Sequence, residues 1–131
     1  MSHFTTVETK INDLVCLREA LDDLEITYDT EDLTVRGWRR ATEKADMVIR
    51  SGSKYDIGVR RLQNGFYELS ADWWGIETTT GKTQAEMMQP ILQRYAYRKI
   101  RKEVSAKGFQ IAQEKNTDKK EIKLTVRRWQ G

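Results

Sequence analysis

The segment that most constrains the fold of this chain is Phe4–Leu24, where a short β-prone run passes directly into a helical pattern. Residues Phe4–Thr9 are rich in threonine and valine, which favour a strand. Asn12 is the expected N-cap of the helix that follows. The apolar face of this helix is marked by Leu14, Leu17, Leu21 and Leu24. A strand joined to a helix with one apolar face predicts helices layered on a sheet.

Further β-prone segments follow before the middle of the chain. We predict strands at Leu33–Trp38 and Met47–Arg50, joined by the polar segment Arg39–Asp46. Ile26–Tyr28 is an additional, short strand candidate.

A β-hairpin is predicted from Tyr55–Leu62 and Phe66–Trp73. A two-residue loop would scatter the apolar side chains of the two strands over both faces of the sheet. A three-residue loop instead places them on one face and sets Arg60 opposite Glu68. Gly65 supplies the left-handed conformation on which such a loop ends. We therefore predict the register that a three-residue loop gives.

A long helix is predicted over Thr83–Lys107, with Thr83 and Glu86 spaced as a capping box. Pro90 lies beyond the first turn, so we expect a kink or a late helix start there. Gly108 is a natural C-cap. The apolar stripe of this helix comprises Met88, Ile91, Leu92, Tyr95 and Ala96.

The chain ends in a second predicted hairpin, which pairs Phe109–Glu114 with Glu121–Trp129 across the polar loop Lys115–Lys120. The predicted order is therefore strand, helix, several strands, helix and two strands. The economical arrangement is an α+β fold, a mostly antiparallel sheet with two helices packed on one face, with a ferredoxin-like tendency. At 131 residues we expect a single domain, residues 1–131.

Composition excludes several classes of protein. No apolar run approaches the length of about 18 residues that a membrane span needs, so we expect no membrane insertion. The start lacks a basic segment followed by an apolar one, which argues against secretion. Cys16 is the only cysteine, which suits a reducing compartment. The net charge of +3 is mild and by itself says little about nucleic acid.

The residues offer no catalytic or metal chemistry. His3 and Cys16 are the only histidine and cysteine, whereas a zinc site needs about four ligands. Gly81-Lys82-Thr83 opens the long helix where a phosphate-binding loop would place such residues, but that loop needs a glycine where Ile76 stands. We therefore expect no enzyme activity, no catalytic residue, no metal and no cofactor.

Arginine beside tryptophan is a stronger functional signal than any catalytic or metal motif in this sequence. It suits three interpretations: stacking and phosphate contacts in an RNA or single-strand reader, anchors of a protein interface, or a solvated surface with rings covering the sheet edge. Arginines and lysines of the long helix, around Tyr95 and Tyr97, add a basic face. If Trp73 faces the core, Trp74 points away and is either an exposed anchor or a cover for another strand. The candidate binding residues are Trp38, Arg39, Arg40, Trp74, Arg127, Arg128 and Trp129.

Three stretches carry a family resemblance: the start MSHFTTVETKINDLVCLREALDDL, the middle DIGVRRLQNGFYELSADWWG, and KGFQIAQEKN with IKLTVRRW near the end. Together they resemble a domain family of unknown function found in cyanobacteria and on algal plastid genomes, the hypothetical chloroplast reading frame thirty-five. The resemblance covers nearly the whole chain, and it implies no catalytic residues. It implies a cyanobacterial cytoplasm or a plastid stroma. Glu25 departs from the glycine expected after Asp23-Leu24 in many relatives.

We therefore predict a non-catalytic binding or assembly factor that contacts another protein, linked to photosynthetic cells. The expected contact surface combines the sheet edge with the arginine–tryptophan residues. The alternative is a module for RNA or single-stranded nucleic acid that uses the same residues. The partner and the oligomeric state stay open.

Overall fold

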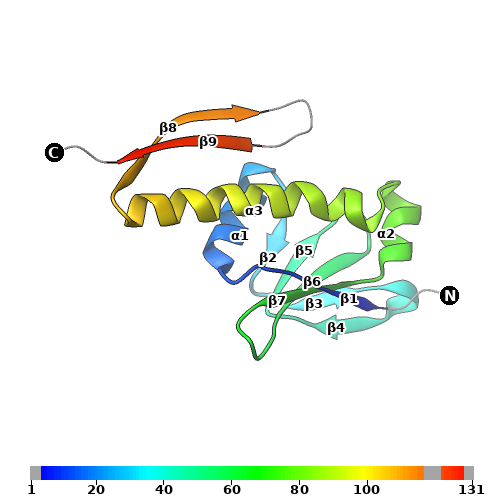
Figure 1. Cartoon of the computed structure of the whole chain (residues 1–131). Coiled ribbons are helices and arrows are strands. Elements are labelled where there is room, and N and C mark those ends of the chain that lie inside the picture. The colour runs from blue at the N-terminus through cyan, green and yellow to red at the C-terminus, as the bar shows by residue number, and fades with distance from the viewer. Residues whose placement is uncertain (1–3, 117–121, 129–131) are drawn as a thin grey trace.

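The computed structural model describes residues 4–116 and 122–128. Within these residues the chain is an α+β protein, as predicted (Figure 1). Its helices and strands are, in chain order, β1 (Thr5–Glu8), α1 (Leu14–Asp23), β2 (Tyr28–Asp29), β3 (Thr34–Arg36), the 3₁₀ turn η1 (Trp38–Arg40), β4 (Thr42–Lys44), β5 (Met47–Arg50), β6 (Asp56–Arg61), β7 (Tyr67–Ala71), α2 (Trp73–Thr80), α3 (Gln84–Ala106), β8 (Phe109–Asn116) and β9 (Ile122–Arg128).

The main sheet runs in the order β1-β7-β6-β5-β2, and each neighbouring pair is antiparallel. Strands β1 and β2, which come before and after α1 in the chain, form the two edges of this sheet. Helices α1 and α3 cover one face, and the β3–β4 ribbon lies on the other (Figure 1). The mostly antiparallel sheet is confirmed, and the ferredoxin-like tendency stays a prediction.

The central hairpin has the register that a three-residue loop requires. Ile57 pairs with Ala71, and Arg60 lies opposite Glu68 with 2.9 Å between Nη2 and Oε1. Gly65 closes the loop with a φ of +88°. The predicted register is therefore confirmed.

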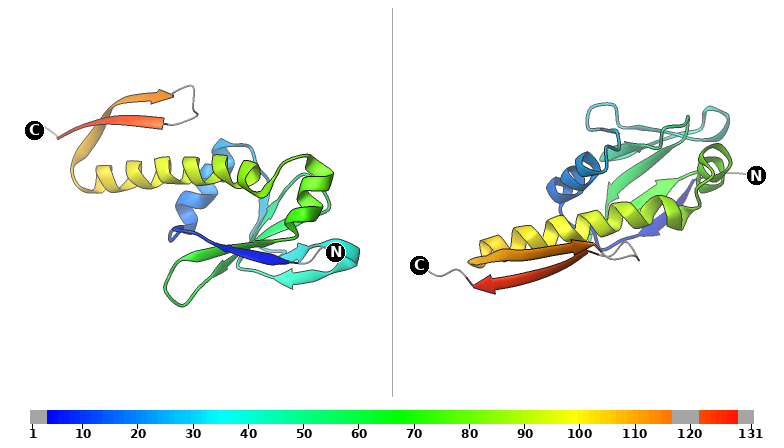
Figure 2. Two further views of the ribbon diagram at one scale, coloured as in Figure 1. Left: turned by 45° about the vertical axis from the view of Figure 1, so that its right-hand side comes forward. Right: turned by 90° about the horizontal axis from the view of Figure 1, so that it is seen from above.

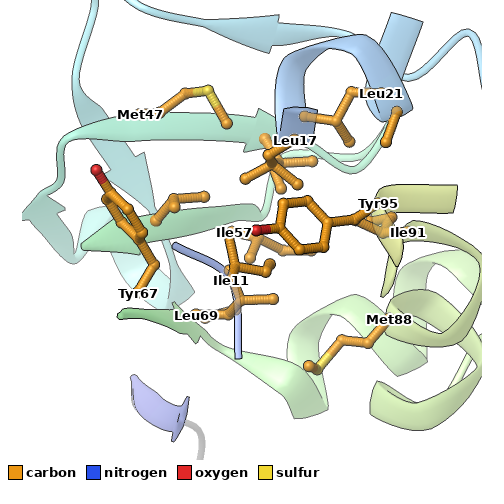
Figure 3. Packing of buried hydrophobic residues seen from close by; sticks show 14 of the residues in the cluster. Ile11, Leu17, Leu21, Met47, Ile57, Tyr67, Leu69, Met88, Ile91 and Tyr95 are labelled. Atoms are coloured by element: carbon orange, nitrogen blue, oxygen red, sulfur yellow. The ribbon is translucent and has the colours of Figure 1, made fainter. Parts of the chain in front are cut away.

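The core lies between this sheet and helices α1 and α3 (Figure 3). Leu17 and Leu21 of α1 face Ile57 and Leu69 of the sheet, and Ile91 closes the cluster from α3. Each of these five side chains is fully buried. Burying an aliphatic side chain stabilises a fold by about 1.5–3 kcal/mol. The helical leucine spacing thus supplies an apolar face that favours docking of α1 on the sheet.

On the opposite face of the sheet, beneath the β3–β4 ribbon, the carboxylate of Asp56 is buried. Asp56 accepts hydrogen bonds from the Arg36 side chain at 2.8 and 2.9 Å and from Arg50 Nη1 at 2.9 Å. Its side chain is fully buried. Two guanidinium groups supply the compensation that a buried charge needs, and they tie the ribbon to the sheet.

Several boundaries near the N-terminus differ from prediction. Asp13, not Asn12, is the N-cap of α1, and its side chain accepts from the Cys16 N–H at 3.1 Å. The Asn12 N–H is bound by Tyr95 Oη at 3.0 Å, which takes Asn12 out of the capping role. The strand predicted at Leu33–Trp38 shortens to β3, and the segment Arg39–Asp46 contains β4. Pairing of β3 with β4 gives this polar segment its strand structure.

The second strand of the central hairpin ends earlier than predicted. It stops at Ala71, and helix α2 begins at Trp73. Asp72 caps α2 by accepting from the Gly75 N–H at 3.0 Å, which stabilises the start of the helix. Gly81 ends α2 with a φ of 78°, so the Gly81-Lys82-Thr83 segment joins two helices rather than a strand and a helix.

Helix α3 has the predicted capping box between Thr83 and Glu86, and it begins at Gln84. The helix continues through Pro90, so a late start is wrong. The burial of its side chains also differs from the predicted stripe, because Ala96 is exposed, whereas Tyr97 is buried outside the core cluster.

Strands β8 and β9 form the predicted second hairpin, which lies along α3 (Figure 2). Strand β8 runs two residues beyond the predicted end at Glu114. The pairing of Phe109 with Arg128 places the end of β9 beside the C-terminal end of α3.

Candidate functional site

An open groove of about 1060 Å³ lies between α2 and the first turns of α3. On α3 its lining residues repeat at four-residue intervals, as in Gln84, Met88 and Leu92, which places them on one helix face. The apolar floor and polar rim suit a binding surface. The residues that line the groove are Trp73, Trp74, Glu77, Thr83, Gln84, Ala85, Met88, Gln89, Leu92 and Gln93.

Helix α2 holds two neighbouring tryptophans in different environments. Trp73 is 8% exposed and its indole N–H donates to the Thr5 carbonyl at 3.2 Å. Trp74 is 55% exposed. Gly75 lets α2 lie against the ring of Tyr55, since a Cβ there would come within 2.3 Å of that ring. The expected orientation is confirmed: Trp73 is buried against the core, and Trp74 is exposed.

The structure brings Trp38 and Trp74 together. Their ring centroids are 6.1 Å apart and the rings are perpendicular, an edge-to-face contact. Trp38 keeps 37% of its surface exposed. The Arg39 guanidinium lies 5.6 Å from the Trp38 ring centroid, within reach of a cation–π contact. Four of the predicted site residues, Trp38, Arg39, Arg40 and Trp74, therefore lie in one region.

The η1 turn holds Arg39 and Arg40 in left-handed conformations, with φ of 52° and 64°. Each such residue costs roughly 1–2 kcal/mol when it is not glycine. Hydrogen bonds from Gly37 N–H to Ala41 O, and from Ala41 N–H to Trp38 O, hold the turn. The predicted strand end at Trp38 is therefore a tight turn. Neither arginine side chain forms a hydrogen bond or an ion pair within the part of the chain that the structure describes.

The basic face predicted on the long helix is largely paired with α1. Arg94 and Arg98 both bind Asp23, at 2.8 and 2.6 Å, and Lys102 binds Asp13 at 2.6 Å. Hydrogen bonds from Arg98 and then Arg94 outweigh burial and lower the pKa of Asp23 to about 2. Burial raises the pKa of Asp13, but hydrogen bonds from Lys102 and the backbone outweigh it and give a pKa of about 2. These cations therefore join two helices.

The other predicted site residues lie elsewhere. Arg127 and Arg128 end β9, which reaches the C-terminal end of α3, whereas the groove lies at its N-terminal end. The two ends of this 23-residue helix are separated by roughly 33 Å at 1.5 Å per residue. Figure 2 shows the end of β9 beside the C-terminal end of α3, whereas α2 lies at the other end of this helix. Trp129 lies outside the described residues. The contact surface expected from these residues is therefore divided between two regions.

Within residues 4–116 and 122–128, no group of three His, Cys, Asp or Glu side chains is placed to hold a metal ion. Cys16 is buried in α1, and burial raises the pKa of its thiol. In the same part of the chain, no helix combines the length and hydropathy of a membrane span.

Most of the groove was not predicted. Helix α2 was missed because three threonines and a glycine give it poor helix propensity. Asp72 before it and Gly81 after it are signals that could have found it. Met88 and Leu92 were predicted as core residues, and their position beside Trp74 depends on α2.

Comparison with known proteins places the chain among uncharacterised relatives. It is 35% identical to the "Uncharacterized protein ycf35" of Guillardia theta, 32% to that of Pyropia yezoensis and 30% to that of Cyanophora paradoxa. Each match covers 98% of both chains. No solved structure gives a significant match. The model of the family "Protein of unknown function (DUF1257)" matches residues 20–125, so the chain belongs to this family, and the resemblance noted in its sequence is confirmed.

Proposed function

We propose that this chain is a non-catalytic binding or assembly factor that contacts another protein through the groove between α2 and α3. The observation that carries the proposal is the exposed edge-to-face pair of Trp38 and Trp74 at the groove. Tryptophan and arginine dominate the binding energy of protein interfaces, and both are present here without a covering element among the described residues.

Covering the exposed tryptophan rings with a protein partner is more favourable than leaving them in water. A tryptophan side chain buries about 150–250 Å² when it is covered, and each Å² of apolar surface contributes about 25 cal/mol. Trp74, which lines the groove together with Met88 and Leu92, and Trp38, which contacts Trp74, can therefore supply several kcal/mol to an interface. A small ligand would need an enclosed pocket, whereas this groove is open.

The alternative of single-stranded nucleic acid has weaker support. Such binding depends on neutralising phosphates with free lysine and arginine side chains. Arg94, Arg98 and Lys102 are already paired with the carboxylates of α1. Glu77 would also place a negative charge against a phosphate backbone in the groove. We therefore retain a protein as the proposed partner.

The test is capture of partners from nuclease-treated native-host lysate, followed by calorimetry with the purified partner. We expect Trp38→Ala plus Trp74→Ala to abolish both capture and direct binding. The matched control is Val15→Ser plus Ile100→Ser, which changes two side chains that are 57% and 45% exposed and lie outside the groove. Capture that is lost after nuclease, or that the tryptophan variant retains, would refute the proposal.

A cellular setting is also proposed. The resemblance implies the cytoplasm of a cyanobacterium-like cell or a plastid stroma, with a role linked to photosynthetic cells. Cell fractionation with an antibody against the chain tests this, and recovery outside those two compartments would contradict it.

A further inference from the structure

The groove has the dimensions of a helix-binding site. The lined face of α3 extends from Gln84 to Gln93, which corresponds to about 14 Å of helix axis. That length matches about two and a half turns of a partner helix. Trp73 and Met88, which are 8% and 6% exposed, form a floor into which the ridge of such a helix can pack.

The elements around the groove favour a helical over an extended partner. Helices α2 and α3 form its walls, and no strand residue is among its lining residues, so the groove offers no open sheet edge. An extended segment would bury its own N–H and C=O groups on the apolar floor without backbone partners, at a cost of about 1–3 kcal/mol for each group. A helix satisfies these groups internally, as in the helix-in-groove mode of recognition.

The charges around the groove are asymmetric. Arg39 and Arg40 follow Trp38, whose ring contacts Trp74 of the groove lining, and neither arginine has an ion pair within the described residues. Glu77 is the acidic residue on the groove wall. Hydrogen bonds with the backbone and side chain of Thr83 lower the pKa of the Glu86 carboxyl, and the positive charge of Lys82 lowers it further. Two unpaired guanidinium groups thus remain to select carboxylates.

We propose that the segment bound in this groove is an amphipathic helix of the partner protein, with an apolar stripe on the floor and carboxylates at the end that meets Arg39 and Arg40. This inference rests on the proposed function and adds the chemistry of the partner. The apolar stripe supplies affinity, and the carboxylates set the direction in which the helix lies.

The test uses a fluorescein-labelled peptide of about 16 residues, long enough to form helix, with leucines along one face and three glutamates at one end. Two matched peptides carry lysines in place of the glutamates, or a central proline that breaks the helix. Fluorescence anisotropy should give about tenfold tighter binding for the glutamate peptide than for either of the others. Trp74→Ala should weaken its binding about tenfold or more.

The charge part of the inference has its own variant. Arg39→Gln plus Arg40→Gln should bring the affinities of the glutamate and lysine peptides to within about threefold. Val15→Ser plus Ile100→Ser should leave all affinities unchanged. Equal binding of the proline peptide would overturn the helical partner, and equal binding of the lysine peptide to wild type would overturn the acidic one. A labelled oligouridine that binds more tightly than the glutamate peptide, and whose binding the two arginine substitutions abolish, would overturn the acidic helix in favour of nucleic acid.

These results separate the two proposals. Absence of peptide binding, combined with tryptophan-dependent capture of a partner, overturns the acidic helix and leaves the protein-binding function standing. Absence of both overturns the function together with the inference.

Discussion

Glu25 occupies the turn that ends α1 in a left-handed conformation, with a φ of 57°. The Ile26 N–H donates to Leu21 O at 2.9 Å and the Glu25 N–H donates to Asp22 O at 3.1 Å. These bonds form a Schellman motif, whose left-handed position is usually glycine. The departure noted in the sequence is therefore a residue that holds a glycine conformation at a steric cost.

Replacing this residue with the expected glycine should stabilise the protein. Glu25→Gly removes the steric strain, and we expect the free energy of unfolding to rise by about 0.5–1 kcal/mol in urea titrations. Asp22→Gly, three residues earlier and inside α1, should instead lower it by about 0.3–0.5 kcal/mol, because glycine is a poorer helix former than aspartate. A loss of stability in Glu25→Gly would show that the glutamate makes a compensating contact.

Helices α1 and α3 are joined by charge as well as by the apolar core. Asp13 and Asp23 both receive side-chain hydrogen bonds from α3, and the pKa of each falls from 3.8 to about 2. Because the folded pKa lies below the unfolded one, this contribution is complete above about pH 4 and is lost as the pH falls toward 2.

The acid limb of the stability curve should report this pairing. We expect the two aspartates together to contribute roughly 2 kcal/mol that disappears between about pH 4 and pH 2, with allowance for solvent screening. Asp23→Asn should lower the free energy of unfolding by roughly 1 kcal/mol at neutral pH and flatten the limb. Urea unfolding at each pH checks this, and parallel curves for the variant and wild type would contradict it.

The β3–β4 ribbon depends on Gly58 for its seat on the sheet. A Cβ at Gly58 would come within 2.8 Å of Val35 Cγ2 and 3.2 Å of Ala45 Cβ. We expect Gly58→Ala to cost about 1–3 kcal/mol, because the buried ribbon has to shift. The same shift should loosen the contact of Trp38 with Trp74, since the ribbon tip carries Trp38.

A double-mutant cycle separates this clash from a general loss of stability. Val35→Ala removes the methyl group that the new Cβ would meet, so the double variant with Gly58→Ala should be more stable than the sum of the single effects predicts. Additive effects would show that the ribbon does not press on Gly58.

At the scale of the whole molecule, the features that depend on a periodic pattern or on neighbouring residues could be predicted from sequence. The leucine spacing of α1, the capping box of α3 and the register of the central hairpin each depend on residues close together in the chain. They follow from helical period, cap chemistry and loop length. The predicted α+β class follows from the order of these elements.

The groove could not be predicted in the same way, because its parts are separated in sequence. Trp38 and Trp74 meet only because the β3–β4 ribbon folds across the sheet and α2 follows β7, and neither the pairing of the ribbon nor α2 was predicted. The basic face of α3 could be predicted from its arginines and lysines, but the pairing of these residues with Asp13 and Asp23 depends on helix packing. Tertiary contacts therefore decided which charged and aromatic residues remain exposed.

The central claim is that the surface beside Trp74 contacts another protein. The most direct measurement places a photoreactive benzoylphenylalanine at Ala85, on the groove, or at Ala106, an exposed position at the far end of the same helix. After illumination in nuclease-treated native-host lysate, we expect a protein adduct at Ala85 that is absent at Ala106 and lost with Trp74→Ala. Identical adducts at both positions, or none at Ala85, would contradict the account.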